Sequence, residues 1–230
     1  MLTSGEERGT DDLPAPAASD DGPKRRQILD GARTVFLAHG FDGASMGEIA
    51  RAAGVSKGTL YVYFPSKEAL FEALTLSERG SLAEALFRLD EADPDVRAVL
   101  RRLGISFLET MVRPEHVSAV RMVIGAADKF PRFGQAFYDA GPRKGAARLA
   151  AYLERQVAAG RLRIANPELA AEQFLSLCSA PIFRRVLFRV EERSDPAAIR
   201  LEVEAALDVF FASYGTAAQA SSRKAAATRD

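Results

Sequence analysis

Apolar residues recur at three- and four-residue spacing along most of this 230-residue chain, and that spacing constrains the fold more than any other feature. It places apolar side chains on one face of an α-helix, whereas no segment shows the strict alternation of a half-buried β-strand. The chain is therefore predicted to be all-α. The periodic segments predict helices over about 24–39, 45–53, 56–63, 67–86, 94–112, 115–128, 131–139, 142–159, 167–189 and 196–214.

Prolines and glycines separate the predicted helices. Gly40 stands where a residue in the left-handed conformation would close the first helix. Gly141-Pro142 is expected to break the chain, and Pro181 is expected to kink helix 167–189, because proline lacks the amide hydrogen that a helix interior needs. The other breaks are expected at Pro94, Pro114, Pro131, Gly160, Pro167 and Ser194-Asp195-Pro196.

The charges and the single cysteine limit the class of protein. The chain has 31 basic and 31 acidic residues, and its zero net charge argues against a protein that coats nucleic acid indiscriminately. Cys178 has no cysteine partner, which favours a reducing compartment. No apolar run approaches the roughly 20 residues of a membrane helix, and no export signal is visible. We expect a cytoplasmic protein with no membrane partner.

The zero net charge is a sum of unlike segments. Residues 1–23 carry a balance of −5 and are rich in Gly, Pro, Ser and Ala, which predicts a disordered acidic leader. Residues 24–68 carry a balance of +3, so the basic excess is densest there. Residues 216–230 are small and polar and are expected to form a disordered tail.

The helices 45–53 and 56–63 are joined by a tight turn. Ser45 has the spacing of a capping box at the first helix, and Ser56 can cap the second. Gly54 can take the positive φ that redirects the chain. The pattern is that of a helix-turn-helix, whose second helix enters the DNA major groove. Similar helix pairs occur in all-α proteins that never bind DNA, so the spacing alone leaves both interpretations open.

Residues 40–74, GFDGASMGEIARAAGVSKGTLYVYFPSKEALFEAL, resemble the N-terminal DNA-binding domain of the TetR/AcrR family of transcriptional regulators. With the helix before them, the resemblance covers about 50 residues. Tyr63 differs from the histidine of many members. The matching positions are Ile49-Ala50, Ala53-Gly54-Val55-Ser56, Gly58-Thr59-Leu60-Tyr61, Tyr63-Phe64 and Ser66-Lys67-Glu68.

The resemblance implies a role for each matching polar position. Residues that would contact phosphate are Ser45, Ser56, Tyr63 and Lys67. Residues that would approach the bases are Lys57, Gly58, Thr59 and Tyr61. The alternative is that both lysines are merely solvated and that Tyr63 and Phe64 belong to the core; we expect core packing for Phe64 and DNA contacts for the lysines.

The boundary of the DNA-binding domain is placed at 24–79, and residues 80–215 are expected to form a larger helical bundle. The stretch from Arg121 to Leu177 resembles the C-terminal domain of an AefR-like subgroup. In the family resembled, this domain binds a ligand and dimerises. Candidates for an apolar ligand pocket are Phe107, Met111, Met122, Phe137, Phe174 and Cys178. Candidates for a homodimer interface are Ile182, Val186, Val203, Leu207, Phe210, Phe211 and Tyr214. Ordinary core packing within one subunit is the alternative for both sets.

Enzymatic chemistry finds no support in the sequence. His39, His116 and Cys178 are too few and too scattered for a typical zinc site, and no P-loop, nucleophile elbow or dinucleotide-binding glycine set is present. No enzyme activity, cofactor or metal is expected. The prediction is a sequence-specific, ligand-responsive repressor that binds a palindromic double-stranded operator as a homodimer and responds to a small apolar effector. The alternative is a helical small-molecule-binding or scaffolding protein without DNA binding.

Overall fold

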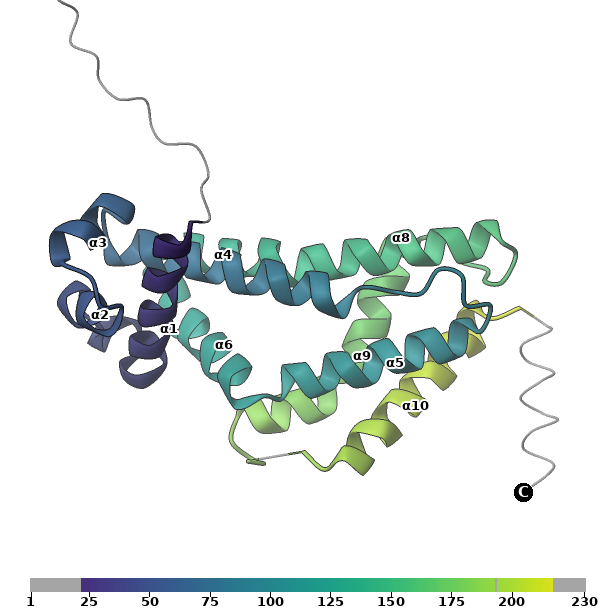
Figure 1. The fold of residues 1–230 in the computed structure, drawn as a ribbon. Helices are drawn as coiled ribbons and strands as arrows, with labels where there is room; N and C mark the ends of the chain where they lie inside the picture. The colour runs from purple at the N-terminus through teal and green to yellow at the C-terminus, as the bar shows by residue number, and fades with distance from the viewer. Residues whose placement is uncertain (1–21, 193, 217–230) are drawn as a thin grey trace, which may run out of the picture.

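The computed structural model describes residues 22–192 and 194–216, and these fold into helices joined by short turns (Figure 1). The predicted all-α class is confirmed; the extended pairing found in the described part is the isolated bridge between Leu162 and Gly215. Most of the predicted leader and tail lies outside the described residues. The helices are α1 (Pro23–Gly43), α2 (Met46–Ala52), α3 (Lys57–Tyr63), α4 (Lys67–Leu86), α5 (Val96–Met111), α6 (Pro114–Ala127), α7 (Pro131–Tyr138), α8 (Lys144–Ala158), α9 (Pro167–Leu187) and α10 (Pro196–Tyr214).

Serine caps fix the starts of the three helices that follow α1. The Ser45 hydroxyl accepts from the Glu48 amide at 3.2 Å while the Glu48 carboxylate accepts from the Ser45 amide at 3.0 Å, which completes the predicted capping box. Ser56 and Ser66 cap α3 and α4 by accepting from amides three residues later. Gly40 adopts φ 71° at the end of the regular part of α1, as predicted, and one further helical turn follows it.

The predicted break at Gly141-Pro142 is wrong. Asp139–Arg143 forms a π-helix that joins α7 to α8 without interruption. The wider turn accommodates the missing amide hydrogen and the ring of Pro142, which an α-helical interior would not. Pro181 likewise lies inside α9.

Two hydrophobic cores organise the molecule, and α4 runs from one towards the other (Figure 1). The first joins α1–α4 to side chains of α6 and α7, among them Val123, Ala126 and Phe133. The boundary expected at residue 79 therefore falls inside α4, and the N-terminal core is completed by helices from the C-terminal segment.

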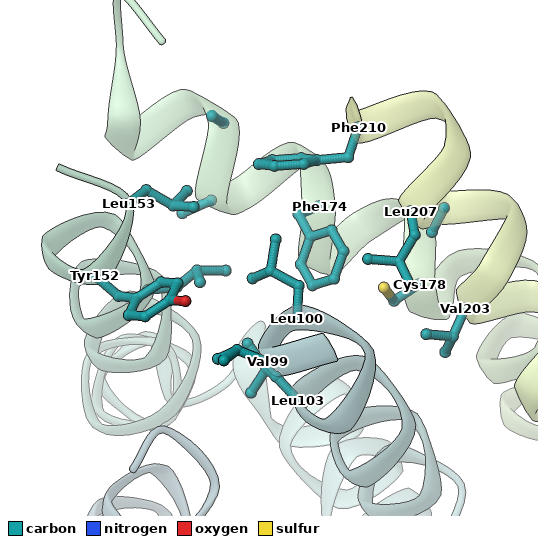
Figure 2. Packing of buried hydrophobic residues seen from close by; sticks show 14 of the residues in the cluster. Val99, Leu100, Leu103, Tyr152, Leu153, Phe174, Cys178, Val203, Leu207 and Phe210 are labelled. Atoms are coloured by element: carbon teal, nitrogen blue, oxygen red, sulfur yellow. The ribbon is translucent and has the colours of Figure 1, made fainter. Parts of the chain in front are cut away.

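The second core is formed by α5, α8, α9 and α10. Figure 2 shows Phe174 of α9 between Leu100 of α5 and Phe210 of α10. The rings of Phe174 and Phe210 meet edge to face with centroids 5.4 Å apart, a favoured aromatic geometry. Within the described residues, no helix has both the length and the hydropathy that crossing a membrane requires.

Candidate nucleic-acid interface and effector cavity

The turn between α2 and α3 is held by contacts from α1. Gly54 adopts φ 62°, and the Val55 amide donates to the Ala50 carbonyl at 2.9 Å. Gln27 of α1 donates to the Ala53 carbonyl at 2.7 Å. Helix α1 passes so close that a Cβ at Gly31 would lie 2.6 Å from Ala53. The sequence analysis did not predict this contact between Gly31 and Ala53. The available signal was a glycine inside a predicted helix, which indicates close packing but does not identify the partner.

Helix α3 buries one residue, Leu60, and exposes its other side chains to solvent wholly or in part. Leu60 is fully buried, whereas Tyr61 is 51% and Val62 is 84% exposed. Gly58 lies one turn before these two residues and is exposed. A single exposed apolar side chain is ordinary, but Tyr61, Val62 and Tyr63 are exposed consecutively on one short helix, and such a cluster favours a surface that another molecule covers. Val62 was not among the predicted contacts; its position three to four residues after Gly58 and Thr59 was the available signal.

The remaining predicted DNA contacts divide into two groups. Ser45, Ser56 and Lys57 are exposed around α3, and Tyr63 is exposed too, which rules out core packing for it. Phe64 is buried as expected. Thr59 is half-buried, and its hydroxyl lies 2.8 Å from that of Ser56, so the two side chains share the cap.

Lys67 has partners within its own chain. Its ammonium donates to the carbonyls of Phe41 at 2.7 Å, Ala44 at 2.9 Å and Asp42 at 3.4 Å, and it lies 4.5 Å from the centre of the Phe41 ring. Three carbonyls use the three donors of an ammonium group. Lys67 therefore ties the start of α4 to the end of α1, and it is not merely solvated. The phosphate contact predicted for it stays a prediction.

A cavity of about 440 Å³ lies among α4, α5, α6, α7, α8 and α9. Its volume is in the range of small-molecule sites. Of the predicted pocket residues, Phe107, Met111 and Phe137 line it. The π-helix contributes Pro142 to the wall.

The other three predicted pocket residues do not line this cavity. Phe174 and Cys178 are fully buried in the second core. Burial raises the pKa of the Cys178 thiol to about 12, which keeps it protonated. Met122 packs against the N-terminal core. An apolar residue in a helical stripe serves core and cavity equally well, and the sequence pattern does not separate the two.

Two polar side chains in the cavity wall were missed. Arg79 of α4 is 6% exposed and His116 of α6 is half-buried. The Arg79 Nη1 lies 2.7 Å from the His116 Nδ1. Burial, and secondarily the positive Arg79, lower the pKa of His116 to about 3, so its imidazole is neutral. Thr75 and Ala83, four residues to either side of Arg79, are buried as well, and this inward-facing stripe was the available signal.

The predicted dimer residues lie mostly inside their own subunit. Their burial reflects packing of α9 and α10 against α5 within one chain, and only Phe211 and Tyr214 remain partly exposed. The buried residues are Ile182, Val186, Val203, Leu207 and Phe210. The exposed large apolar residues of α10 are instead Leu201 and Val209, and those of α9 are Leu169 and Leu177; Val209 shares a groove with both leucines of α9. This set is called the outer α9–α10 face below.

Two known protein families match the two parts of this structure, the helix-turn-helix segment and the helical bundle. Residues 28–74 match the bacterial regulatory proteins of the tetR family, and residues 98–216 match the C-terminal domain of AefR-like transcriptional repressors. The second match covers more than half of the chain. The chain belongs to the TetR family of transcriptional regulators. Within that family, its C-terminal domain is of the AefR-like type.

Solved structures resemble nearly the whole described fold. A putative TetR-family regulator from Mesorhizobium loti superposes with a TM-score of 0.79 at 28% identity, covering 84% of this chain and 97% of its own. The flavonoid-responsive regulator FrrA superposes with a TM-score of 0.71 at 36% identity, covering 84% of this chain and 98% of its own.

Curated relatives resemble the N-terminal part. The repressor Rv1474c of Mycobacterium tuberculosis is 39% identical over 75 residues, which are 32% of this chain and 40% of that protein. The regulator UidR of Escherichia coli K12 is 46% identical over 57 residues, which are 25% of this chain and 29% of that protein. The matches thus span well under half the length of these relatives, and both are transcriptional regulators rather than enzymes.

Proposed function

We propose that the protein is a one-component repressor that binds a two-fold operator as a homodimer and is released by a small molecule. Each subunit places α3 in a major groove, with Gly58, Tyr61 and Val62 towards the bases. The observation that carries the proposal is the exposed apolar face of α3, held by a turn that Gln27 and the Gly31–Ala53 contact fix from behind. The named repressors among the relatives support the direction of regulation.

The dimer would form through the outer α9–α10 face. Leu201, Ala205 and Val209 follow one another at four-residue spacing and are all exposed. On α9, Leu169 and Leu177 are exposed at eight-residue spacing, on the same side as Gln173. A groove between the two helices is lined by residues of both. A symmetric pair of such faces would bury these side chains and set the spacing of the two α3 helices.

The cavity is the effector site in this proposal. It touches α4, whose first residue is tied to the end of α1. The helix-turn-helix units, residues 45–63 of each subunit, are called the reading heads below. A molecule in the cavity changes operator affinity only if its affinity differs between the DNA-binding arrangement of the two reading heads and the arrangement that does not bind DNA. The name of FrrA, a regulator that responds to flavonoids, supports a small-molecule effector for this fold.

The experiment is specific DNA binding by fluorescence anisotropy, with duplexes tiled across the region upstream of the protein's own gene. We expect Tyr61→Ala to abolish the difference between the operator and a random duplex while the helical content stays unchanged. Phe188→Ala is the control, since Phe188 is a 74% exposed aromatic residue that lies outside both α3 and the cavity lining. Equal binding of both duplexes by the wild-type protein would favour a ligand-binding protein without operator recognition.

A further inference from the structure

A guanidinium group lies at the wall of the cavity, almost fully removed from water. Arg79 is 6% exposed, and its guanidinium lies 4.5 Å from the centre of the Phe137 ring. Taking a charge out of water is costly unless a partner of opposite charge compensates it. An arginine retained in such a place indicates a use for the charge.

Among its described neighbours, Arg79 has no ion-pair partner, and its charge is offset only by the electrostatic attraction of the adjacent Glu78. Its hydrogen-bond partner, His116, is neutral and supplies no negative charge. The adjacent Glu78 carboxylate is engaged by Arg33, whose Nε lies 3.0 Å from Glu78 Oε1. Across residues 22–192 and 194–216, no carboxylate forms an ion pair with Arg79. Glu172, the acidic residue of the cavity lining, is exposed on α9.

The rest of the wall is apolar and rich in rings. Phe87, Phe107, Phe137 and Phe183 line the cavity, with aliphatic side chains of α4 between them. Such a surface binds flat ring systems by stacking and edge-to-face contacts. Arg79 has five N–H donors, of which His116 engages one nitrogen, so others remain for a ligand.

We propose that the cavity takes a ring-containing apolar carboxylate, whose carboxylate group pairs with Arg79 while its rings lie against the phenylalanines. This replaces the purely apolar effector expected from the sequence. The ligand supplies the direct ion-pair partner that the buried guanidinium lacks among the described residues, and the planar fork of arginine matches the two oxygens of a carboxylate. The inference rests on the proposed function only in treating this cavity as the effector site.

The test uses two probes of nearly the same size and shape, the anionic biphenyl-4-carboxylate and the neutral biphenyl-4-carboxamide, in which an NH2 donor replaces one acceptor oxygen. Their binding to the full-length protein is measured by isothermal titration calorimetry without DNA. The wild-type protein should bind the carboxylate about tenfold more tightly than the amide, the ratio expected of a charge-assisted hydrogen bond. Arg79→Met should remove this preference, and Arg79→Lys should keep part of it.

The matched control is Arg113→Met, because Arg113 is an exposed arginine close to His116 in the sequence. It should retain the wild-type ratio. If Arg79→Met does not fold by circular dichroism, Arg79→Gln removes the charge and keeps a donor for His116. Wild-type protein that binds neither probe, or both equally, would overturn the proposal, as would an Arg79→Met variant that keeps the preference. Since DNA is absent, failure of operator binding is a separate result.

Discussion

Phe133 and Phe137 lie one helical turn apart on α7; Phe133 is fully buried in the N-terminal core, whereas Phe137 packs against the edge of that core and also lines the cavity. The Phe133 ring packs in the N-terminal core, with centroids 4.7 Å from Phe71 and 5.0 Å from Phe41. The Phe137 ring lines the cavity under the Arg79 guanidinium. One short helix therefore contacts both the cavity proposed as the effector site and the core that holds α2 and α3, which makes α7 a candidate for coupling between the two.

The two phenylalanines should respond differently to truncation. Phe133→Ala removes a fully buried ring and should lower the free energy of unfolding by about 3–5 kcal/mol. Phe137→Ala should cost less, keep operator affinity, and weaken the response to an effector. Denaturant unfolding and operator anisotropy with and without effector measure both. A full effector response in Phe137→Ala would exclude α7 as the connection.

Gly31 and Gly58 should separate stability from recognition. Gly31→Ala forces a Cβ to within 2.6 Å of Ala53, and overpacking of this kind costs about 1–3 kcal/mol. Gly58→Ala meets its nearest atom at 3.7 Å, so the fold should be unaffected while close approach to DNA is lost. Thermal unfolding and operator binding of both variants should show opposite patterns. Gly125→Ala, with open space around it, is the control for both.

Lys57 and Lys67 should differ in the salt dependence of operator binding. Lys57 is exposed, and the base contact expected for it brings a positive charge to the DNA surface, so Lys57→Ala should reduce the slope of log K against log salt by about 1. Lys67→Ala should leave the slope unchanged and lower the free energy of unfolding by about 1–3 kcal/mol, because three carbonyls lose their donor. A reduced slope for Lys67→Ala would show that Lys67 leaves its carbonyls for phosphate.

The outer α9–α10 face should control the oligomeric state. Val209→Asp adds a charge to an exposed apolar position and should yield folded monomers in analytical ultracentrifugation, with weakened operator binding. Phe210→Asp is uninformative on this point, since Phe210 is 2% exposed and a charge there should unfold the subunit. Ile124→Asp, at an exposed apolar site on α6, should leave the assembly unchanged. Dimeric Val209→Asp would place the interface elsewhere.

Acid should destabilise the protein through His116. Its pKa is about 3 in the folded state, below the ordinary value near 6.5, so the unfolded chain takes up a proton first as the pH falls. Stability is therefore present above pH 6.5 and is lost as the pH falls towards 3, by about 2 kcal/mol at pH 5. His116→Gln should flatten this part of the unfolding profile. His39→Gln, at an exposed site on α1, should not.

Local features of the sequence predicted most of the helices and the reading head. Serine caps, the glycine turn and proline at helix starts act within a few residues, and the structure reproduces them at Ser45, Ser56 and Gly54. The predicted break at Gly141-Pro142 was wrong because it also relied on local features alone. The local signal of this pair indicates a break, and the π-helix is maintained by packing against α4 and the neighbouring helices, which no local pattern encodes.

The choice between core, cavity and subunit interface could not be predicted. Val203 and Val209 are both valines on α10, yet Val203 is fully buried and Val209 is exposed. Phe107 and Phe174 are alike in sequence context, yet one lines the cavity and the other fills the core. These differences arise from contacts between helices distant in the chain. Arg79 shows the same limit, because its burial and its lack of an ion pair with any described carboxylate depend on helices distant in the chain.

Helix α4 begins at the lysine that holds the reading head and carries the cavity arginine twelve residues, or roughly 18 Å, further along. Under the proposed function, operator and effector therefore act on a single element. Thermodynamic linkage makes their effects reciprocal: whatever factor the effector removes from operator affinity, the operator removes from effector affinity. The cavity of an operator-bound protein is then a weaker site than that of the free protein, so the concentration of effector that a cell must reach is set partly by the DNA.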